Sequence, residues 1–194
     1  MNYKEQDYPT LQIESDYVGR AMADPAAFAS LFDHYFPLVH KYAFYRIGDI
    51  TTADDLTAEV FERLLIALPR YTPGKAPFGA WLFGIARHVI NNHHRSQKRK
   101  HEVPSEEMDH LVAPEPQPEA AALIYEADRN LLNALNKLTG REKDIIALKF
   151  AAELTNRQIA KLIGLGESHI GVILFRSMQR LRMILQDMEE KDER

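Results

Sequence analysis

One stretch of the chain carries basic and amide side chains at a spacing suited to binding a nucleic-acid backbone. Arg87, Asn91, Arg95 and Lys98 follow one another at steps of four, four and three residues, so on a helix they lie near one another on its outer side. Lys and Arg at successive turns bind phosphates, while Asn, Thr and Tyr contact or stack on bases outside a duplex. The same positive charges, together with the basic residues that follow them, also suit the C-terminal end of a helix, where they offset the helix dipole. Both interpretations stay open on this stretch alone.

A second stretch has the pattern of a helix-turn-helix. Residues 154–165 predict a capped short helix closed by Gly164, and a second helix runs from Glu167 to about residue 185. In this motif the second helix enters the major groove with its N-terminal residues. Apolar residues of both helices would pack the motif together, namely Ile159, Ala160, Leu162, Leu165 and Ile170. A structural helical hairpin is the alternative, but ten basic against four acidic side chains between residues 129 and 186 favour DNA.

A third pattern is an acidic helix face. A helix capped by Thr51 or Thr52 would have one apolar side, formed by Leu56, Val60, Phe61, Leu64, Leu65 and Leu68. Asp55, Glu59 and Glu62 lie on its other side at i, i+4 and i+7. Such a face is either solvated or a surface for a basic partner.

These residues need helices to position them, and the surrounding sequence predicts only helices. Asp24 before Pro25 begins the first helix, which Pro37 is expected to kink or restart and Gly48 to end. After a loop with several Pro and Gly, a third helix runs from Phe78 to Lys98. Its inward positions are Trp81, Leu82, Ile85 and Val89. The predicted fold class is all-α.

Proline and charge divide the chain into two small helical domains. Residues 102–119 hold six acidic and no basic side chains, with prolines at 104, 114, 116 and 118, which cannot hold a helix or a central strand. We therefore expect an acidic, Pro-rich linker. The predicted division is a polar extension at 1–19, a helical domain at 20–100, the linker at 101–119, a helix-turn-helix domain at 120–187 and an acidic tail at 188–194.

The average composition hides this division. The formal net charge is -4, from 24 Lys and Arg against 28 Asp and Glu, which by itself argues against a nucleic-acid partner. Resolved along the chain, it is two basic modules offset by an acidic linker and tail. The absence of cysteine excludes disulfides and thiolate metal sites. With no apolar run long enough to cross a membrane, the expected location is the cytoplasm.

Histidine-rich segments raise the alternative of a metal-dependent enzyme. His88, His93, His94, His101 and His110 lie close in sequence, but His88 with His93 or His94 misses the i, i+3 or i+4 spacing of helical ligand pairs. No Gly-rich phosphate loop or nucleophile elbow is present. We predict no catalytic residue, no metal site and no cofactor.

Three motifs in order resemble an extracytoplasmic-function (ECF) sigma factor, a small two-domain member of the bacterial sigma-70 family. They are residues 53–64, residues 78–87 continuing to Arg95, and residues 138–142 leading into 154–165. The similarity covers about residues 20 to 185. It implies a chain that binds core RNA polymerase and directs promoter recognition and melting.

The resemblance implies a role for each surface. The acidic helix face, on the helix that contains residues 53–64, would bind the beta-prime clamp helices through Asp54, Asp55, Glu59, Glu62 and Arg63. The loop and following helix would capture the melted minus-ten strand through Arg70, Tyr71, Thr72, Lys75, Trp81, Arg87, Asn91, Asn92, Arg95, Lys98 and Arg99. The C-terminal domain would sit on the beta flap and read the minus-thirty-five element through Thr155, Arg157, Glu167, Ser168, His169, Arg176 and Arg180. An anti-sigma factor is the further partner that the family implies.

Some positions depart from the family pattern. His88 and Asn92 stand where the family usually has Asn and Asp, and Gly171 and Ile173 stand where basic residues are frequent. Two alternatives follow for the minus-thirty-five element: weaker duplex contact, or contact that rests on phosphates through Arg157, Arg176 and Arg180. The rival function is a stand-alone helix-turn-helix regulator, which would leave the acidic face and the basic helix unexplained.

Overall fold

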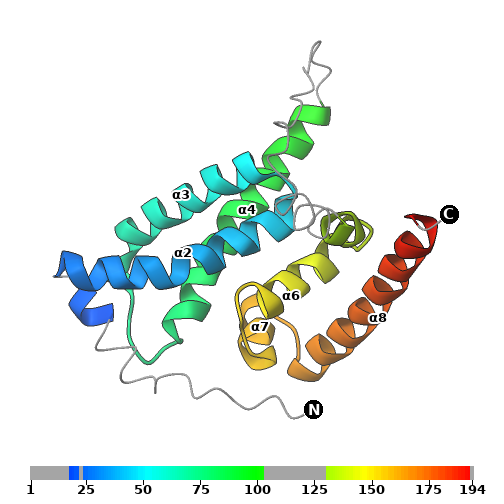
Figure 1. Cartoon of the computed structure of the whole chain (residues 1–194). Helices are drawn as coiled ribbons and strands as arrows, with labels where there is room; N and C mark the ends of the chain where they lie inside the picture. Colours follow the sequence, from blue (N-terminus) through cyan, green and yellow to red (C-terminus); the bar gives the residue numbers. More distant parts are fainter. Residues whose placement is uncertain (1–17, 22–23, 103–129, 193–194) are drawn as a thin grey trace.

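The computed structural model describes residues 18–21, 24–102 and 130–192. All regular structure in these ranges is helical (Figure 1), which confirms the all-α prediction. The predicted linker at 101–119 and extension at 1–19 lie almost entirely outside the described residues, so their prediction stays open.

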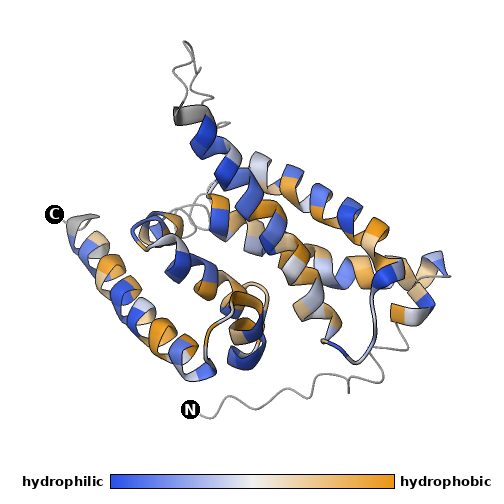
Figure 2. Cartoon of the chain, turned by 180° about the vertical axis from the view of Figure 1, so that it is seen from behind, coloured by the Kyte–Doolittle hydropathy of each residue, from blue (hydrophilic) through white to orange (hydrophobic). Residues whose placement is uncertain are grey.

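The first domain is a bundle of three long helices. These are α2 (Pro25–Ile47), α3 (Ile50–Ala67) and α4 (Phe78–Glu102), with a short turn η1 (Leu68–Arg70) after α3. Their facing sides bury Val39, Tyr42, Ala43, Val60, Phe61, Leu64, Leu82 and Phe83. In Figure 2 the helices are banded in hydrophilic and hydrophobic colours, as expected of amphipathic helices that share a core.

Local chemistry explains where these helices begin and end. The Asp24 carboxylate accepts from the N–H of Ala26 at 2.9 Å, and Gly48 closes α2 with a φ of 84°. The predicted cap of α3 was wrong: Asp49, not Thr51 or Thr52, is the N-cap and accepts from the N–H of Thr52 at 2.7 Å. Hydrogen bonds from the side chain of Thr52 and then from its N–H lower the pKa of the Asp49 carboxyl. Only Gly48 and Asp49 separate the two helices.

Pro37 does not restart α2, which runs through it as one helix. Proline removes the hydrogen bond to the carbonyl four residues earlier, that of Asp33. Both residues are exposed, so water satisfies the freed carbonyl and the helix continues.

The second domain holds a helix-turn-helix, as predicted. After a helical segment at residues 130–136 come α6 (Gly140–Phe150), α7 (Asn156–Ile163) and α8 (Glu167–Asp192). Capping boxes begin α6 at Thr139 and α7 at Thr155, and Gly164 ends α7 with a φ of 80°. Ile159, Ala160 and Ile170 are buried between the helices. Helix α8 continues beyond the predicted end near residue 185.

The two domains pack against each other. Helix α6 contacts α2, and α7 contacts α4, so the C-terminal domain lies beside the first bundle with α8 on its far side (Figure 1). Gly84 of α4 lies at this contact, where a Cβ would meet Leu162 Cδ1 of α7 at 3.5 Å, an ordinary van der Waals distance. Buried residues of both domains form one continuous apolar cluster.

Candidate nucleic-acid interface

The acidic side chains of α3 lie on its outer surface. Asp55 and Glu62 are exposed, and Glu59 accepts from Arg63 Nη2 at 2.7 Å in an i, i+4 pair. Asp54 lies toward α2, where its Oδ1 is 2.9 Å from His40 Nε2. The predicted acidic residues therefore lie at solvent, although Asp54 is set apart from the others.

Two apolar residues extend this face. Leu65 was predicted to be buried, but it is 53% exposed, and Ile66 beside it is 67% exposed. Ile66 follows Glu62 by one helical turn, so it shares the acidic face. It also borders a cavity of about 410 Å³ lined by Ala67, Trp81, Ile85 and His88, among others. Two adjoining exposed apolar residues beside carboxylates suit a protein-binding surface, and the sequence pattern had assigned one of them, Leu65, to the core.

The loop between α3 and α4 is closed by its own hydrogen bonds. The Tyr71 hydroxyl donates to the Ala76 carbonyl at 2.9 Å, and the N–H of Lys75 donates to the Thr72 carbonyl at 3.3 Å. The Tyr71 ring packs 4.9 Å from Trp81, measured between centroids. Arg70, Thr72 and Lys75 remain exposed around this aromatic anchor. The loop thus presents polar side chains on a fixed support.

The basic residues of α4 divide between two environments. Arg95, Lys98 and Arg99 are exposed, as expected of a strand-binding surface. Arg87 and Asn91 were predicted on the outer side of the helix, but they face the second domain, and Arg87 Nε donates to Asp144 Oδ2 of α6 at 2.7 Å. The amide oxygen of Asn91 accepts from Arg46 Nη2 at 3.0 Å. Asn92 lies 2.9 Å from the His88 ring nitrogen.

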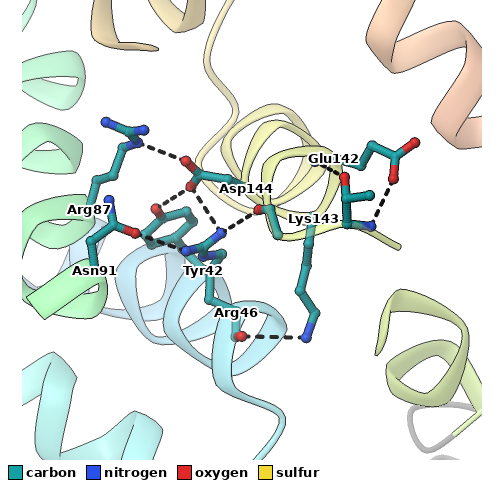
Figure 3. A network of polar contacts seen from close by, with 9 residues as sticks. Tyr42, Arg46, Arg87, Asn91, Glu142, Lys143 and Asp144 are labelled. Carbon is teal, nitrogen blue, oxygen red and sulfur yellow. Dashed lines mark hydrogen bonds and ion pairs between the residues drawn. The ribbon is translucent and has the colours of Figure 1, made fainter. Parts of the chain in front are cut away.

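Asp144 is the centre of a buried polar network between the domains (Figure 3). Its Oδ1 accepts from the Tyr42 hydroxyl at 2.8 Å and lies 3.5 Å from Arg46 Nη1. Arg46 also donates to the Gly140 carbonyl at 3.0 Å. Burial, together with the Asp144 charge, raises the pKa of Tyr42 well above its ordinary value, so the hydroxyl stays a donor. No sequence pattern pointed to Tyr42, Arg46 or Asp144.

A cavity of about 560 Å³ adjoins this network and is strongly basic. Among the residues that line the cavity, Asp144 is the one carboxylate. The cations that line it are Arg46, Arg87, Arg95, Arg141 and Lys143. Burial and the nearby Arg46 lower the pKa of Lys143. Burial, and after it the nearby charges of Arg46, His93 and Lys143, lower the pKa of His94 to about 4. The ring is therefore neutral at pH 7.

The helix-turn-helix presents an exposed polar end. The predicted residues Thr155, Arg157, Glu167, Ser168, His169 and Arg176 are all at solvent. Arg180 is exposed as well, but its Nη1 lies 3.6 Å from Glu142 Oε2 of α6. The Thr155 side chain accepts from the N–H of Gln158 and caps α7.

Two further residues of α8 share this exposed surface. Val172 is 46% and Phe175 64% exposed, and they follow Ser168 and His169 by about one and two helical turns. Ile173 instead packs against the core, and Gly171 faces the side chain of Asn156. The sequence does not indicate which residues of the apolar run 172–175 are exposed, because that depends on which side of α8 is buried.

Within residues 18–21, 24–102 and 130–192, no three His, Asp or Glu side chains lie close enough together to hold a metal ion. No single helix of the described chain is long and apolar enough to cross a membrane, and the pair α7 and α8, which passes only when joined, is bent by 105°.

The described residues thus form a helical domain with an acidic face on α3 and exposed bases on α4, followed by a domain with a helix-turn-helix. Residues 31–100 match the family Sigma-70 region 2, and residues 134–183 match Sigma-70, region 4. The chain belongs to the ECF RNA polymerase sigma factors of the sigma-70 family.

Curated relatives share this organisation along most of the chain. The ECF RNA polymerase sigma factor BldN of Streptomyces coelicolor is 34% identical over 89% of this chain, which spans 66% of the length of BldN. ShbA of Streptomyces griseus is 30% identical, with 83% of this chain and 88% of ShbA covered. SigX of Bacillus subtilis is 29% identical, with 84% and 86% covered.

Two solved structures have the same fold. CnrH, solved with the cytosolic domain of CnrY, has a TM-score of 0.67 at 19% identity and covers 90% of this chain and 97% of its own. The sigma factor RpoE of Bartonella quintana, solved with the anti-sigma factor NepR, has a TM-score of 0.63 at 20% identity, with 82% and 96% covered.

Proposed function

We propose that this chain directs transcription initiation in the cytoplasm as an ECF sigma factor that binds core RNA polymerase and promoter DNA, with no catalysis of its own. Family membership supports the role in outline. The observation that carries the assignment of surfaces is their separation: exposed acids on α3, exposed bases on α4, and exposed polar residues at the start of α8.

The acidic face of α3 is the proposed polymerase surface, on the beta-prime clamp helices. Asp55 and Glu62 offer charge for steering and register, while Ile66 offers apolar area to bury. Asp54, Glu59 and Arg63 belong to the same proposal, although each already has a partner within the chain. Asp54 pairs with His40, and Glu59 pairs with Arg63.

The loop after α3 and the exposed part of α4 are the proposed minus-ten surface. Extruding a base from the stack costs a few kcal/mol, which stacking and phosphate contacts offset. Thr72 and Lys75 surround the fixed Tyr71 and Trp81 rings, and the cations from Arg95 to Arg99 continue along the helix. The loop would hold the base while α4 holds the strand.

The start of α8 is the proposed minus-thirty-five surface. Ser168, His169 and Arg176 offer hydrogen bonds to bases or phosphates, and Arg157 offers a phosphate contact from α7. Val172 and Phe175 suit thymine methyl groups, which are apolar contacts in the major groove. The family often has basic side chains at 171 and 173. In this chain, apolar contacts of neighbouring α8 residues with the DNA would take their place.

The deciding experiment is run-off transcription with core polymerase on a promoter library. We expect selective initiation by the wild-type chain, and about a tenfold or greater loss of core binding in the double variant Asp55→Lys, Glu62→Lys. Asp33→Lys is the matched control, because it reverses an exposed acid on α2. Promoter binding by the chain alone, with no selective initiation when core is added, would instead indicate a stand-alone regulator.

An anti-sigma factor is the proposed inhibitory partner. RpoE of Bartonella quintana was solved with such a protein, and its fold matches this chain. The exposed apolar residues beside the acidic face of α3, Leu65 and Ile66, suit a protein partner that would compete with polymerase. Competition between a candidate inhibitor and core polymerase for the wild-type chain tests this, with Ile66→Ser as the weakened variant.

A further inference from the structure

We infer that in the free chain the second domain docks on the strand-binding surface of the first, with the Asp144 carboxylate in the place of a DNA phosphate. Docking and strand binding would therefore exclude each other. The inference rests on the proposed role of α4 in binding the minus-ten strand.

The contacts of Asp144 are those that a phosphate would make. Its Oδ2 accepts from Arg87 Nε at 2.7 Å, and its Oδ1 lies 3.5 Å from Arg46 Nη1 (Figure 3). Arginine binds carboxylate and phosphate oxygens with the same donors and similar geometry. With Asp144 only 4% exposed, a backbone phosphate cannot reach Arg87 along this side while α6 is in place.

The amide of Asn91 is occupied in the same arrangement. Its oxygen accepts from Arg46 Nη2 at 3.0 Å, and Arg46 is held in turn by the Gly140 carbonyl of α6. The exposed Arg95, Lys98 and Arg99 remain open to a strand. A strand would thus first contact the outer end of α4 and gain Arg87 only when α6 leaves, while the Asn91 oxygen stays paired with Arg46 of α2.

The polar part of the interface suits reversible docking. A buried ion pair often stabilises no more than apolar packing of the same volume would, because both charges lose water. Arg46 Nε is buried without a hydrogen-bond partner, and the adjoining cavity of about 560 Å³ leaves the contact incompletely filled. Five cations surround the single carboxylate there, so a polyanion has an electrostatic advantage over Asp144.

The first test measures strand affinity in the full chain without polymerase. The probe is fluorescein-labelled single-stranded DNA of random sequence, followed by anisotropy at fixed salt. Asp144→Asn keeps the side-chain shape but removes the charge that holds Arg46 and Arg87, so we expect about tenfold tighter binding than wild type. Asp33→Asn makes the same charge change at an exposed site on α2 and should leave the affinity near the wild-type value.

The second test measures docking itself. The chain has no cysteine, so labels at Ala58→Cys on α3 and Gln186→Cys on α8 report one distance between the domains. Asp144→Asn should lengthen this distance, and the DNA probe should lengthen it in the wild-type chain. Tyr42→Phe removes only the hydroxyl donated to Asp144 and should give a smaller change in both measurements, which keeps the test open if Asp144→Asn folds poorly.

The outcomes separate this inference from the proposed function. A longer label distance in Asp144→Asn or Tyr42→Phe with unchanged strand affinity would overturn the inference, as would an unchanged distance on strand binding. If Lys98→Ala with Arg99→Ala leaves strand affinity unchanged in every background, α4 is not the strand surface, and the proposed role of α4 fails together with the inference.

Discussion

Replacing Gly171 with alanine is expected to stabilise the second domain. Glycine inside a helix is about 1 kcal/mol less favourable than alanine, chiefly because the unfolded chain loses more freedom. The gain is realised only where the folded backbone accepts a side chain. Gly171 lies within α8, and its φ is not among the positive values of the described glycines.

The surroundings of Gly171 leave space for the added methyl group. A Cβ there would meet Asn156 Nδ2 at 3.9 Å, an ordinary van der Waals contact. No strain term therefore opposes the propensity gain, and we expect about 1 kcal/mol of added stability, or about 2 to 4 °C in melting temperature. Gly164 is the matched control, because its φ of 80° places it in the left-handed region. Gly164→Ala should cost about 1 kcal/mol.

Urea denaturation followed by circular dichroism at a helical wavelength measures both variants against wild type. Gly171→Ala should raise the free energy of unfolding and Gly164→Ala should lower it, so the two variants should differ by about 2 kcal/mol, with m-values unchanged. A Gly171→Ala variant that is no more stable than wild type would refute the reasoning, because it would mean that α8 departs from regular helix at this residue or that Asn156 does not have the space described.

Three other substitutions test the second domain and the cavity between the domains. Thr155→Ala removes the capping box of α7, in which Thr155 and Gln158 exchange two hydrogen bonds, and should cost about 1 kcal/mol in the same denaturation assay. Arg157→Ala should lower the slope of log affinity against log salt by about 0.9 for minus-thirty-five duplex DNA, as measured by anisotropy at several salt concentrations. The pKa of His94 is about 4 when folded, below its value of 6.5 when unfolded, so the unfolded state binds the proton first and stability should fall as pH drops from 6.5 towards 4. The full shift corresponds to about 3 kcal/mol, but the ring is partly exposed and screened, so we expect about 1 kcal/mol, and this part of the pH dependence should be missing in His94→Gln.

The helices of this chain were predictable because their signals are local. The Asp24-Pro25 start, the Gly48 stop and the end of α7 at Gly164 act within one helical turn, and all three form as predicted. The start of α3 was missed for a related reason. Asp49 and the threonines at 51 and 52 are all suitable caps, and Asp49 is the cap because only Gly48 and Asp49 connect α2 to α3.

Exposure was harder to predict than secondary structure. Leu65 fits the apolar stripe of α3 in sequence, yet the neighbouring helices cover only the side formed by Leu56, Val60 and Leu64. Val172 and Phe175 lie in an apolar run whose buried members are set by how α6 and α7 pack on α8. Such assignments depend on contacts between elements, which periodicity within one element does not contain.

The network around Asp144 left no signal in the sequence at all. Asp144 is one of four acids among ten bases in its region, and by charge counting it merely reduces a basic surplus. In the structure it receives donors from residues 42 and 87, more than fifty positions away along the chain. Arg87, the first residue of the basic stripe that made the first domain a candidate for DNA, binds this carboxylate together with Arg46. The donors of arginine bind carboxylate and phosphate oxygens alike, so under the proposed role of α4 a single acid would couple the affinity for DNA to the arrangement of the domains.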